Sequence, residues 1–201
     1  PFGFRMRAEF RIWHEQGQAH FAMNKPGVKR PYIIDDFPIG AELINRLMPD
    51  ILAAVNADEM LSRKLFSMEF LTTTTQQVLV TLIYHKPLDE QWQQQASLLA
   101  DQLSIKIIGR SRKQKMVLTD DFVIEEISVD GKLYQYQQVE ASFTQPNAQV
   151  NQKMLAWASD CLKDSNQDLV ELYCGNGNFT AVLAQHFDKV LATEISKVSV
   201  N

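Results

Sequence analysis

A glycine turn between two apolar runs limits the fold of this chain more than any other feature of its sequence. Residues 168–180 read Asp-Leu-Val-Glu-Leu-Tyr-Cys-Gly-Asn-Gly-Asn-Phe-Thr, so a strand-like run stops at Gly175 and Gly177. Glycine has no Cβ, which permits a positive φ and lets the backbone lie close to a ligand. A second apolar run ends in Glu194, and a carboxylate about 20 residues after such a turn suits the two hydroxyls of a ribose. The pattern predicts a nucleoside-cofactor site on an α/β sheet.

The residues around the turn favour one nucleoside cofactor over another. Dinucleotide sites usually carry a third glycine, which is replaced here by Thr180. Glu171 lies near the end of the first apolar run, where a carboxylate would repel a diphosphate and attract a sulfonium or ammonium group. This sign argument favours S-adenosylmethionine over NAD. The alternative, that Glu171 only caps a loop, stays open.

Composition narrows the class of protein. The chain has 201 residues, of which 45% are hydrophobic, and this content is ample for a core. Apolar runs such as Val78–Tyr84 are too short to span a bilayer, so we expect no membrane partner. Cys161 and Cys174 lack C-x-x-C spacing, which argues against a metal site or a disulfide framework and favours the reducing cytoplasm. The net charge of −4 gives no sign of nucleic acid, so any RNA contact must come from a local patch.

The two apolar runs around the glycine turn are too few for a complete α/β domain. Strands at Asp168–Tyr173 and Lys189–Thr193 would need cover on both faces and several further strands beside them. The sequence also starts without Met, and it stops at Asn201 where residues 196–201 should be entering a helix. We therefore expect a fragment, or the ordered portion, of a longer enzyme.

The residues before the turn predict a compact α+β domain over residues 1–138. Residues 4–13 alternate with period two, which predicts a half-buried strand, and Gly17 predicts a turn into a second strand. Apolar spacing predicts an amphipathic helix over Ala41–Val55, kinked or split at Pro49. Asp130-Gly131 is a good two-residue hairpin turn. The other expected elements are helices at Leu88–Leu103 and Asn147–Leu162 and strands at His20–Asn24, Leu65–Leu71, Val78–Tyr84, Ile105–Ile108, Met116–Leu118, Phe122–Val129 and Lys132–Gln138. Residues 139–201 then form the start of the α/β unit.

Basic residues gather at three places that suit RNA phosphates. Arg5, Arg7 and Arg11 lie on one face of the first expected strand, with Glu9 among them and Trp13 beside them. Alternating arginines match phosphate geometry, and an aromatic neighbour can stack on a base. Two further basic runs fall in expected loops, namely Lys25, Lys29 and Arg30, and Arg110, Arg112, Lys113 and Lys115. Each group has an alternative interpretation as ordinary solvated charge, but their combination in an acidic protein favours RNA contact.

The segment Ser142–Asn147 precedes an expected helix. Asn147 is a suitable N-cap and Pro146 stops the helix from extending backward, which explains the segment structurally. Its functional interpretation lets Phe143 stack on a base and lets the Gln145 amide hydrogen-bond a cofactor or base. Cys174 has no histidine near it in the sequence, so we interpret it as a small packing residue and not as a nucleophile.

Four segments can be compared with known families, namely residues 5–14, Ser142–Asn147, Glu171–Phe179 and Leu191–Ile195. Together they resemble the bacterial tRNA (uracil-5-)-methyltransferase family. The resemblance covers nearly the whole chain in order. It implies an α+β RNA-binding domain followed by the start of an α/β Rossmann-like domain of an S-adenosylmethionine-dependent methyltransferase. The implied substrate is the T-loop uridine at position 54 of tRNA, flipped out of its loop to reach the cofactor.

The resemblance also assigns residues to the two ligands. The family's cofactor positions match residues of the glycine turn and its surroundings, so the expected cofactor contacts are Gln145, Tyr173, Gly175, Gly177, Asn178 and Glu194. The family's RNA positions match Arg5, Arg7, Arg11, Phe66 and His85 of the first domain. Phe143, which could stack on a base, is added to these expected tRNA contacts.

The reaction of the family implies that catalytic groups are missing from residues 1–201. In the family a cysteine thiolate adds to uracil C6, the resulting enolate takes the methyl group at C5, and a general base removes the C5 proton. The thiolate, the base and an Asp-Pro-Pro cofactor loop lie downstream of the matched segments, so we expect these residues alone to be inactive. Relatives that act on ribosomal RNA carry an iron–sulfur cluster on four cysteines. This chain has two, which favours the tRNA branch without a cluster.

Three alternatives stay open from the sequence. The chain could be a non-catalytic module that binds and remodels tRNA, a ribosomal RNA 5-methyluridine methyltransferase, or an NAD-linked enzyme. The first two also predict RNA binding, whereas the third predicts nicotinamide binding that depends on Glu194.

Overall fold

The computed structural model describes residues 2–165 and 167–200, which divide into two compact units. The first unit comprises Pro1–Thr72 and Gln76–Asp121, and the second comprises Thr73–Thr75 and Phe122–Asn201. Pro1 and Asn201, the outer ends of the two expected domains, lie outside the described residues. Within the described part of the chain, no helix has both the length and the apolar character needed to cross a membrane.

A seven-stranded sheet in the order β3-β2-β1-β4-β5-β6-β7 forms the frame of the first unit. Its strands are β1 (Arg7–Glu15), β2 (Gln18–Met23), β3 (Tyr32–Ile33), β4 (Leu65–Thr72), β5 (Val78–Tyr84), β6 (Lys106–Ser111) and β7 (Gln114–Val117). Neighbouring strands run antiparallel except β5 and β6, which are parallel because α3 (Glu90–Leu103) connects them as a crossover.

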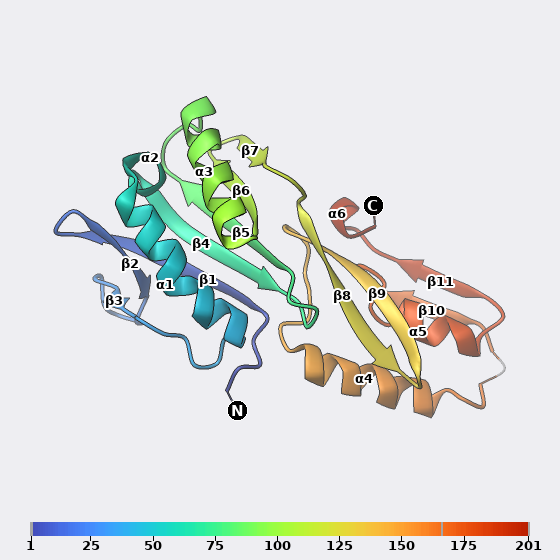
Figure 1. Cartoon of the computed structure of the whole chain (residues 1–201). Helices are drawn as coiled ribbons and strands as arrows, with labels where there is room; N and C mark the ends of the chain where they lie inside the picture. The colour runs from blue at the N-terminus through green and yellow to red at the C-terminus, as the bar shows by residue number, and fades with distance from the viewer. Residues whose placement is uncertain (1, 166, 201) are drawn as a thin grey trace. The chain divides into compact units, whose positions relative to one another are not determined.

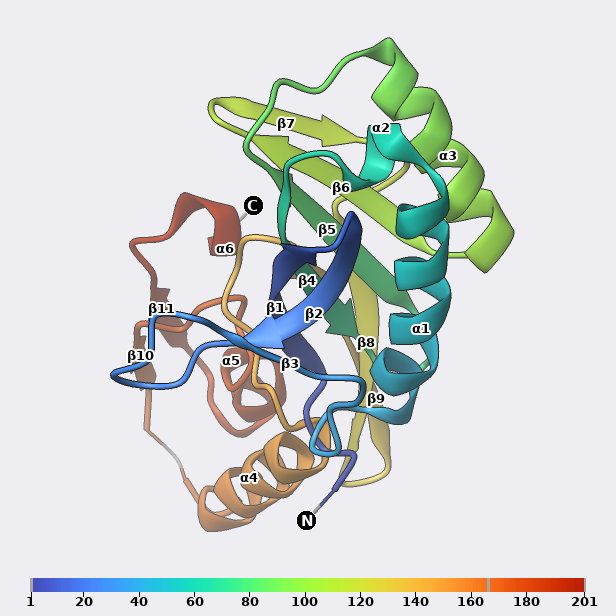
Figure 2. The ribbon, with the colours of Figure 1, turned by 90° about the vertical axis from the view of Figure 1, so that its left-hand side faces the viewer.

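Two long helices, α1 (Glu42–Ala57) and α3, cover the same face of this sheet (Figure 2). The expected alternation of β1 is confirmed, because Ala8, Phe10 and Ile12 are buried in the core beneath the helices. The expected break at Pro49 is not observed, since α1 runs through that residue as one helix. The short helix α2 (Glu59–Ser62) follows α1 and is capped by the side chain of Asp58. The first unit is therefore a sheet with one helix-covered face and one face free of helices.

Two-residue turns close the hairpins where the sequence predicts them. Asp130 and Gly131 have φ angles of 52° and 78°, and they join β8 (Phe122–Val129) to β9 (Lys132–Val139). A turn with positive φ at both central residues matches the twist of the flanking strands. The second unit begins with this hairpin.

The second unit packs one helix on the hairpin and ends in two parallel strands. Helix α4 (Ala148–Cys161) lies against β8 (Figure 1), and Asn147 caps it as expected by accepting a hydrogen bond from the Val150 amide at 3.0 Å. Strands β10 (Leu169–Leu172) and β11 (Val190–Thr193) are parallel, which confirms the expected start of an α/β sheet. The short helices of this part are α5 (Thr180–Leu183), η1 (Ala184–His186) and α6 (Lys197–Val200).

The boundary between the compact units lies earlier than the expected domain boundary at residue 138. The sequence placed the hairpin β8–β9 with the first domain, because both contain short strands. In the structure the side chains of Ile127 and Tyr136 share a core with Leu155 of α4 and Val182 of α5. The hairpin therefore packs with the second unit, in which it forms one wall of the candidate site.

One expected loop is a strand pair instead. The basic run at residues 110–115 was expected in a loop between strands, but Arg110 ends up in β6 and Lys115 in β7, where they are register partners. Only a tight turn at Arg112 and Lys113 joins the two strands. Lys115 also forms an ion pair with Asp121 at 2.6 Å. The charges of this run are thus held on a hairpin.

We expect the substitution Gly109→Ala to destabilise the first unit by about 1–3 kcal/mol through overpacking. A Cβ at Gly109 of β6 would lie 2.2 Å from the ring of Trp92 and 2.6 Å from Leu88, and Trp92 is fully buried. Urea unfolding of Gly109→Ala, Trp92→Leu and the double variant measures the effect. The loss caused by alanine should shrink in the Trp92→Leu background. An equal loss in both backgrounds would show that the ring is not what excludes a side chain here.

Candidate functional site

The glycine turn adopts the strained backbone that its sequence predicts. Gly175 and Gly177 have φ angles of 59° and 77°, in the left-handed region where a side chain is disfavoured. Tyr173 also has a positive φ of 58°, although it carries a side chain that is 83% exposed. A left-handed non-glycine residue costs of order 1 kcal/mol and persists only where its surroundings hold it. The turn follows β10 directly, at the edge of the parallel sheet where ligands of α/β folds bind.

Glu194, just after β11, holds this turn in place. Its Oε2 accepts a hydrogen bond from the Gly175 amide at 2.8 Å, and its Oε1 accepts bonds from the amides of Ile195 at 2.8 Å and Ser196 at 2.7 Å. These bonds, those from Ser196 and Gly175 first, lower the pKa of the Glu194 carboxyl. A lowered folded pKa means that the contribution to stability is present above the pKa of an unfolded glutamate and is lost as pH falls through the folded value. The carboxylate therefore stays charged throughout the neutral range.

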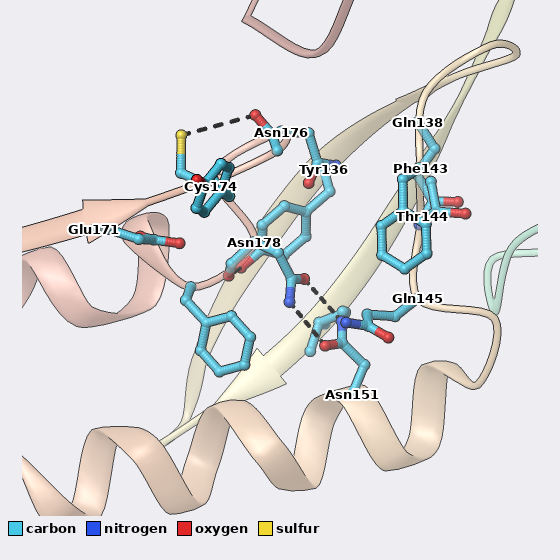
Figure 3. A pocket seen from close by; sticks show the side chains of 14 residues that line it. Tyr136, Gln138, Phe143, Thr144, Gln145, Asn151, Glu171, Cys174, Asn176 and Asn178 are labelled. Atoms are coloured by element: carbon cyan, nitrogen blue, oxygen red, sulfur yellow. Dashed lines mark hydrogen bonds between the residues drawn. The ribbon is translucent and has the colours of Figure 1, made fainter. Parts of the chain in front are cut away.

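A cavity of about 150 Å³ lies beside the turn and collects most of the expected cofactor contacts (Figure 3). Gln145, Tyr173, Gly175 and Asn178 line it, together with Phe143, which was expected to contact RNA. Gly177 and Glu194 are not among the lining residues, and Glu194 reaches the cavity only through the Gly175 amide that it binds. The residues expected from the sequence thus supply two parts of the lining, namely the glycine turn and the segment that contains Phe143 and Gln145.

Two asparagines pair with each other in the lining of the cavity, and only Asn178 was expected from the sequence. Asn178 Nδ2 donates to Asn151 Oδ1 at 2.8 Å, and Asn151 Nδ2 donates to Asn178 Oδ1 at 2.8 Å (Figure 3). The Tyr136 hydroxyl also donates to the backbone carbonyl of Asn178 at 2.9 Å. Each amide keeps one N–H and one lone pair for a ligand, because the reciprocal pair uses only one of each. Helix α4 and the hairpin therefore fix the orientation of an expected cofactor residue.

The position of Asn151 in the sequence already indicates a buried hydrogen bond, although it was not among the expected site residues. Asn151 is 4% exposed and shares one face of α4 with the buried residues Ala148, Leu155 and Ser159. A polar side chain at a buried position of an amphipathic helix requires a hydrogen-bond partner. Tyr136 gave no comparable signal, because its partner is a carbonyl 42 residues away.

Glu171 and Cys174 line the same cavity without forming a reactive pair. The Glu171 carboxylate accepts a hydrogen bond from the Thr180 hydroxyl, so the residue that replaces a third glycine anchors the start of α5. Burial, with the Glu171 and Glu194 carboxylates second, raises the pKa of the Cys174 thiol. A raised pKa keeps the thiol protonated, which is the opposite of what a nucleophile requires. This agrees with the interpretation of Cys174 as a packing residue.

A Ser–His–Asp cluster in the same unit is not arranged for nucleophilic catalysis. Ser159 is fully buried, donates its hydroxyl proton to Asp130 at 2.7 Å, and lies 2.8 Å from His186 Nε2. Since the only hydroxyl proton goes to Asp130, the His186 ring must donate to Ser159 and cannot act as its base. Across the described residues, no three His, Cys, Asp or Glu side chains group in a way that could hold a metal ion.

Of the residues expected to contact RNA, Phe143 lies in the second unit, and the others lie in the first unit and only partly meet. Arg5 precedes β1, Arg7 pairs with Glu69 at 3.6 Å, and the Arg11 guanidinium lies over the Phe66 ring at 4.9 Å. Phe66 stacks on His85 with ring centroids 4.2 Å apart. The structure therefore brings Arg11, Phe66 and His85 into one cluster and leaves Arg5 outside β1.

Comparison with known proteins identifies a family. The family model described as tRNA (Uracil-5-)-methyltransferase matches residues 2–201. A tRNA/tmRNA (uracil-C(5))-methyltransferase of Cellvibrio japonicus is 59% identical over 198 residues, covering 98% of this chain and 54% of that protein. A protein of the same description from Acinetobacter baylyi is 53% identical over 201 residues, covering 98% of this chain and 56% of that protein. The chain thus spans about half the length of the curated relatives it matches.

One solved structure shares the fold. The tRNA (uracil-54, C5)-methyltransferase of Pyrococcus abyssi, solved in complex with S-adenosyl-L-homocysteine, superposes with a TM-score of 0.71 at 17% identity. The match covers 99% of this chain and 51% of that chain. The expected architecture, an α+β part followed by the start of a Rossmann-like part, is confirmed by this likeness.

We expect Asn151→Ala to destabilise the second unit by about 1–3 kcal/mol, because Asn178 loses both bonds of the amide pair. Asn151→Asp should also destabilise it, since one carboxylate oxygen would face Asn178 Oδ1. Urea unfolding measures both variants against Gln149→Ala, a control at an exposed position of the same helix that should change stability by less than about 0.5 kcal/mol. Equal stability of Asn151→Ala and the control would mean that the pair does not hold the loop.

Proposed function

The chain belongs to the tRNA (uracil-5-)-methyltransferase family, and on that premise we propose that the whole protein transfers a methyl group from S-adenosylmethionine to C5 of a tRNA uracil. We further propose that the target is the T-loop uridine at position 54 and that the reaction takes place in the cytoplasm. The observation that carries the proposal is the glycine turn held by the Glu194 carboxylate, and the resemblance to the family assigns these residues to the cofactor.

The residues present fit S-adenosylmethionine by their charge and by the open space beside the glycine turn. A Cβ at Gly175 would meet no atom within 4 Å, so the backbone there leaves open space beside the cavity for a ligand. In our proposal the ionised Glu194 binds the ribose hydroxyls, and Gln145, Tyr173 and Asn178 contact the rest of the cofactor. Glu171 lines the cavity, and its negative charge attracts a sulfonium while it would repel a pyrophosphate. The same charge argues against the alternative of an NAD-linked enzyme.

The chain's own residues bind and orient in this proposal, and they do not supply the nucleophile. S-adenosylmethionine, when bound, supplies an electrophilic methyl group. Cys174 has a raised thiol pKa and is tied to the turn, so it does not fit the thiolate that must add to uracil C6. We propose that the thiolate and the general base belong to the part of the protein that the longer relatives possess and residues 1–201 do not include.

The first unit supplies tRNA recognition in this proposal. Arg5, Arg7 and Arg11 contact the phosphates of the T-arm, and the cluster of Phe66 and His85 offers aromatic rings to bases. Phe143 is 71% exposed at the cofactor cavity, which suits stacking on a flipped uracil.

We expect Glu194→Gln in the full-length protein to raise the dissociation constant of S-adenosylhomocysteine about tenfold or more. The substitution keeps the size of the side chain but removes its negative charge. That charge strengthens the hydrogen bonds that the carboxylate accepts from three backbone amides and, in our proposal, from the ribose hydroxyls. Isothermal titration calorimetry measures the affinity for S-adenosylhomocysteine. Filter binding measures the affinity for tRNA, which should be unchanged.

The control for this experiment is Asp188→Asn, which removes the same charge from an exposed position in the same unit. It should leave both affinities unchanged. Parallel losses of cofactor and tRNA affinity in Glu194→Gln would indicate misfolding and would remove the support for a ribose contact.

For the first unit, we expect Arg7→Ala to weaken tRNA binding and to lower the slope of log K against log salt concentration by about 1, as for the loss of one phosphate contact. Arg46→Ala is the matched control, since Arg46 is exposed on α1, which covers the opposite face of the sheet. Binding titrations at several salt concentrations compare the two. If Arg7→Ala does not change the slope, Arg7 does not contact a phosphate and is an ordinary solvated residue of the strand face.

A further inference from the structure

A second cavity, of about 270 Å³, lies in the first unit on the sheet face turned away from α1 and α3. Glu9 and Arg11 of β1 line it, and they alternate with Ala8 and Phe10, which are buried beneath the helices. Its volume is just below the range of typical small-molecule sites, which begins at about 300 Å³, and is large enough for a single nucleobase.

Two small side chains produce this hollow. Arg11 pairs in register with Ala22 of β2 on one side and with Ser67 of β4 on the other. Both small residues are buried, at 0% and 2% exposure, although neither belongs to the core beneath the helices. Larger residues at these two positions would fill the space beside Arg11, so the cavity is a consequence of the sequence at the centre of the sheet.

The floor of the cavity contains polar atoms that lack partners. Ser67 Oγ and Arg11 Nε are both buried, and neither has a hydrogen-bond partner among the residues that the structure describes. A buried polar group without a partner destabilises the folded state, so two adjacent ones at a cavity mark a place where a ligand restores the lost bonds. Ser67 is the more telling of the two, because its side chain is almost wholly enclosed.

The groups around the cavity select one kind of ligand. Glu9 offers two carboxylate acceptors, Arg11 offers an N–H donor, and Ser67 offers a hydroxyl that donates or accepts. Phe66 adds an aromatic wall, and Asn24 adds an amide at the rim. Guanine is the RNA base whose Watson–Crick edge carries two adjacent N–H donors beside a carbonyl acceptor. The two donors match the carboxylate, and the carbonyl matches the guanidinium and the hydroxyl.

We propose that this cavity binds an unpaired guanine base of the RNA substrate, with Glu9 accepting from its N1–H and N2–H groups and Arg11 and Ser67 donating to its O6. The inference rests on the proposed tRNA-binding role of the first unit and deepens it. RNA-binding domains commonly read the edges of splayed single-stranded bases in this way. The cavity thus adds base selection to a surface otherwise suited to phosphates.

The test uses the full-length protein and a labelled tRNA transcript displaced by unlabelled octauridines that carry one central guanine, inosine or adenine. Inosine lacks the N2 amino group, so the guanine octamer should compete about tenfold better than the inosine octamer. Glu9→Gln should abolish this preference. Glu69→Gln, which removes the same charge from the register partner of Glu9 but does not line the cavity, should keep it. Ser67→Ala should lower competition by the guanine octamer and leave competition by an all-uridine octamer unchanged.

The outcomes separate this inference from the function on which it rests. If the transcript binds but guanine and inosine octamers compete equally, the guanine site is refuted and the methyltransferase proposal stands. If Glu9→Gln and Glu69→Gln both retain the preference, the base is read elsewhere and the cavity is not its site. If no transcript binds at all, both proposals fail together.

Discussion

The hydrogen bond from the Gly175 amide to the Glu194 carboxylate joins the ends of two parallel strands and fixes the turn between β10 and α5. This turn has three residues at positive φ, so the bond holds a backbone that is strained at Tyr173, where the residue is not glycine. The amides of Ser196, Gly175 and Ile195 lower the pKa of this carboxyl, and those of Ser196 and Ile195 also fix its orientation. The side chain that shapes the turn is the same one that, in our proposal, accepts hydrogen bonds from the ribose hydroxyls.

The opposite side of the turn is held by neutral amides. Asn151 orients Asn178 through a reciprocal pair, and Tyr136 binds the Asn178 carbonyl, so the hairpin β8–β9 and helix α4 act as a fixed wall. This explains why the hairpin packs in the second unit. The turn beside the cavity is thus held by a carboxylate on one side and by neutral amides on the other. This combination suits a ligand that has both a sulfonium and hydrogen-bonding groups. The two unpartnered polar atoms at Ser67 and Arg11 follow the same logic in the first unit, where small neighbours leave room for a base.

Much of this architecture was predictable from local sequence patterns. The alternation in β1, the cap at Asn147, the Asp130–Gly131 turn and the positive φ of both glycines all follow from residue types over short distances. What the sequence did not reveal depends on tertiary partners. Its short strands predicted that the hairpin β8–β9 belongs to the first domain, but its side chains pack against α4 and α5. Pro49 stays within a continuous helix. Asn151 was recognisable as a polar residue on the apolar face of α4, whereas the importance of Ser67 appears only from its burial.

The most direct test of the account is a calorimetric titration of the full-length protein with S-adenosylhomocysteine and, separately, with NAD. We expect saturable heat with the first ligand and none with the second, because the Glu171 carboxylate that lines the cavity repels a pyrophosphate. Heat with NAD, or none with S-adenosylhomocysteine, would contradict it.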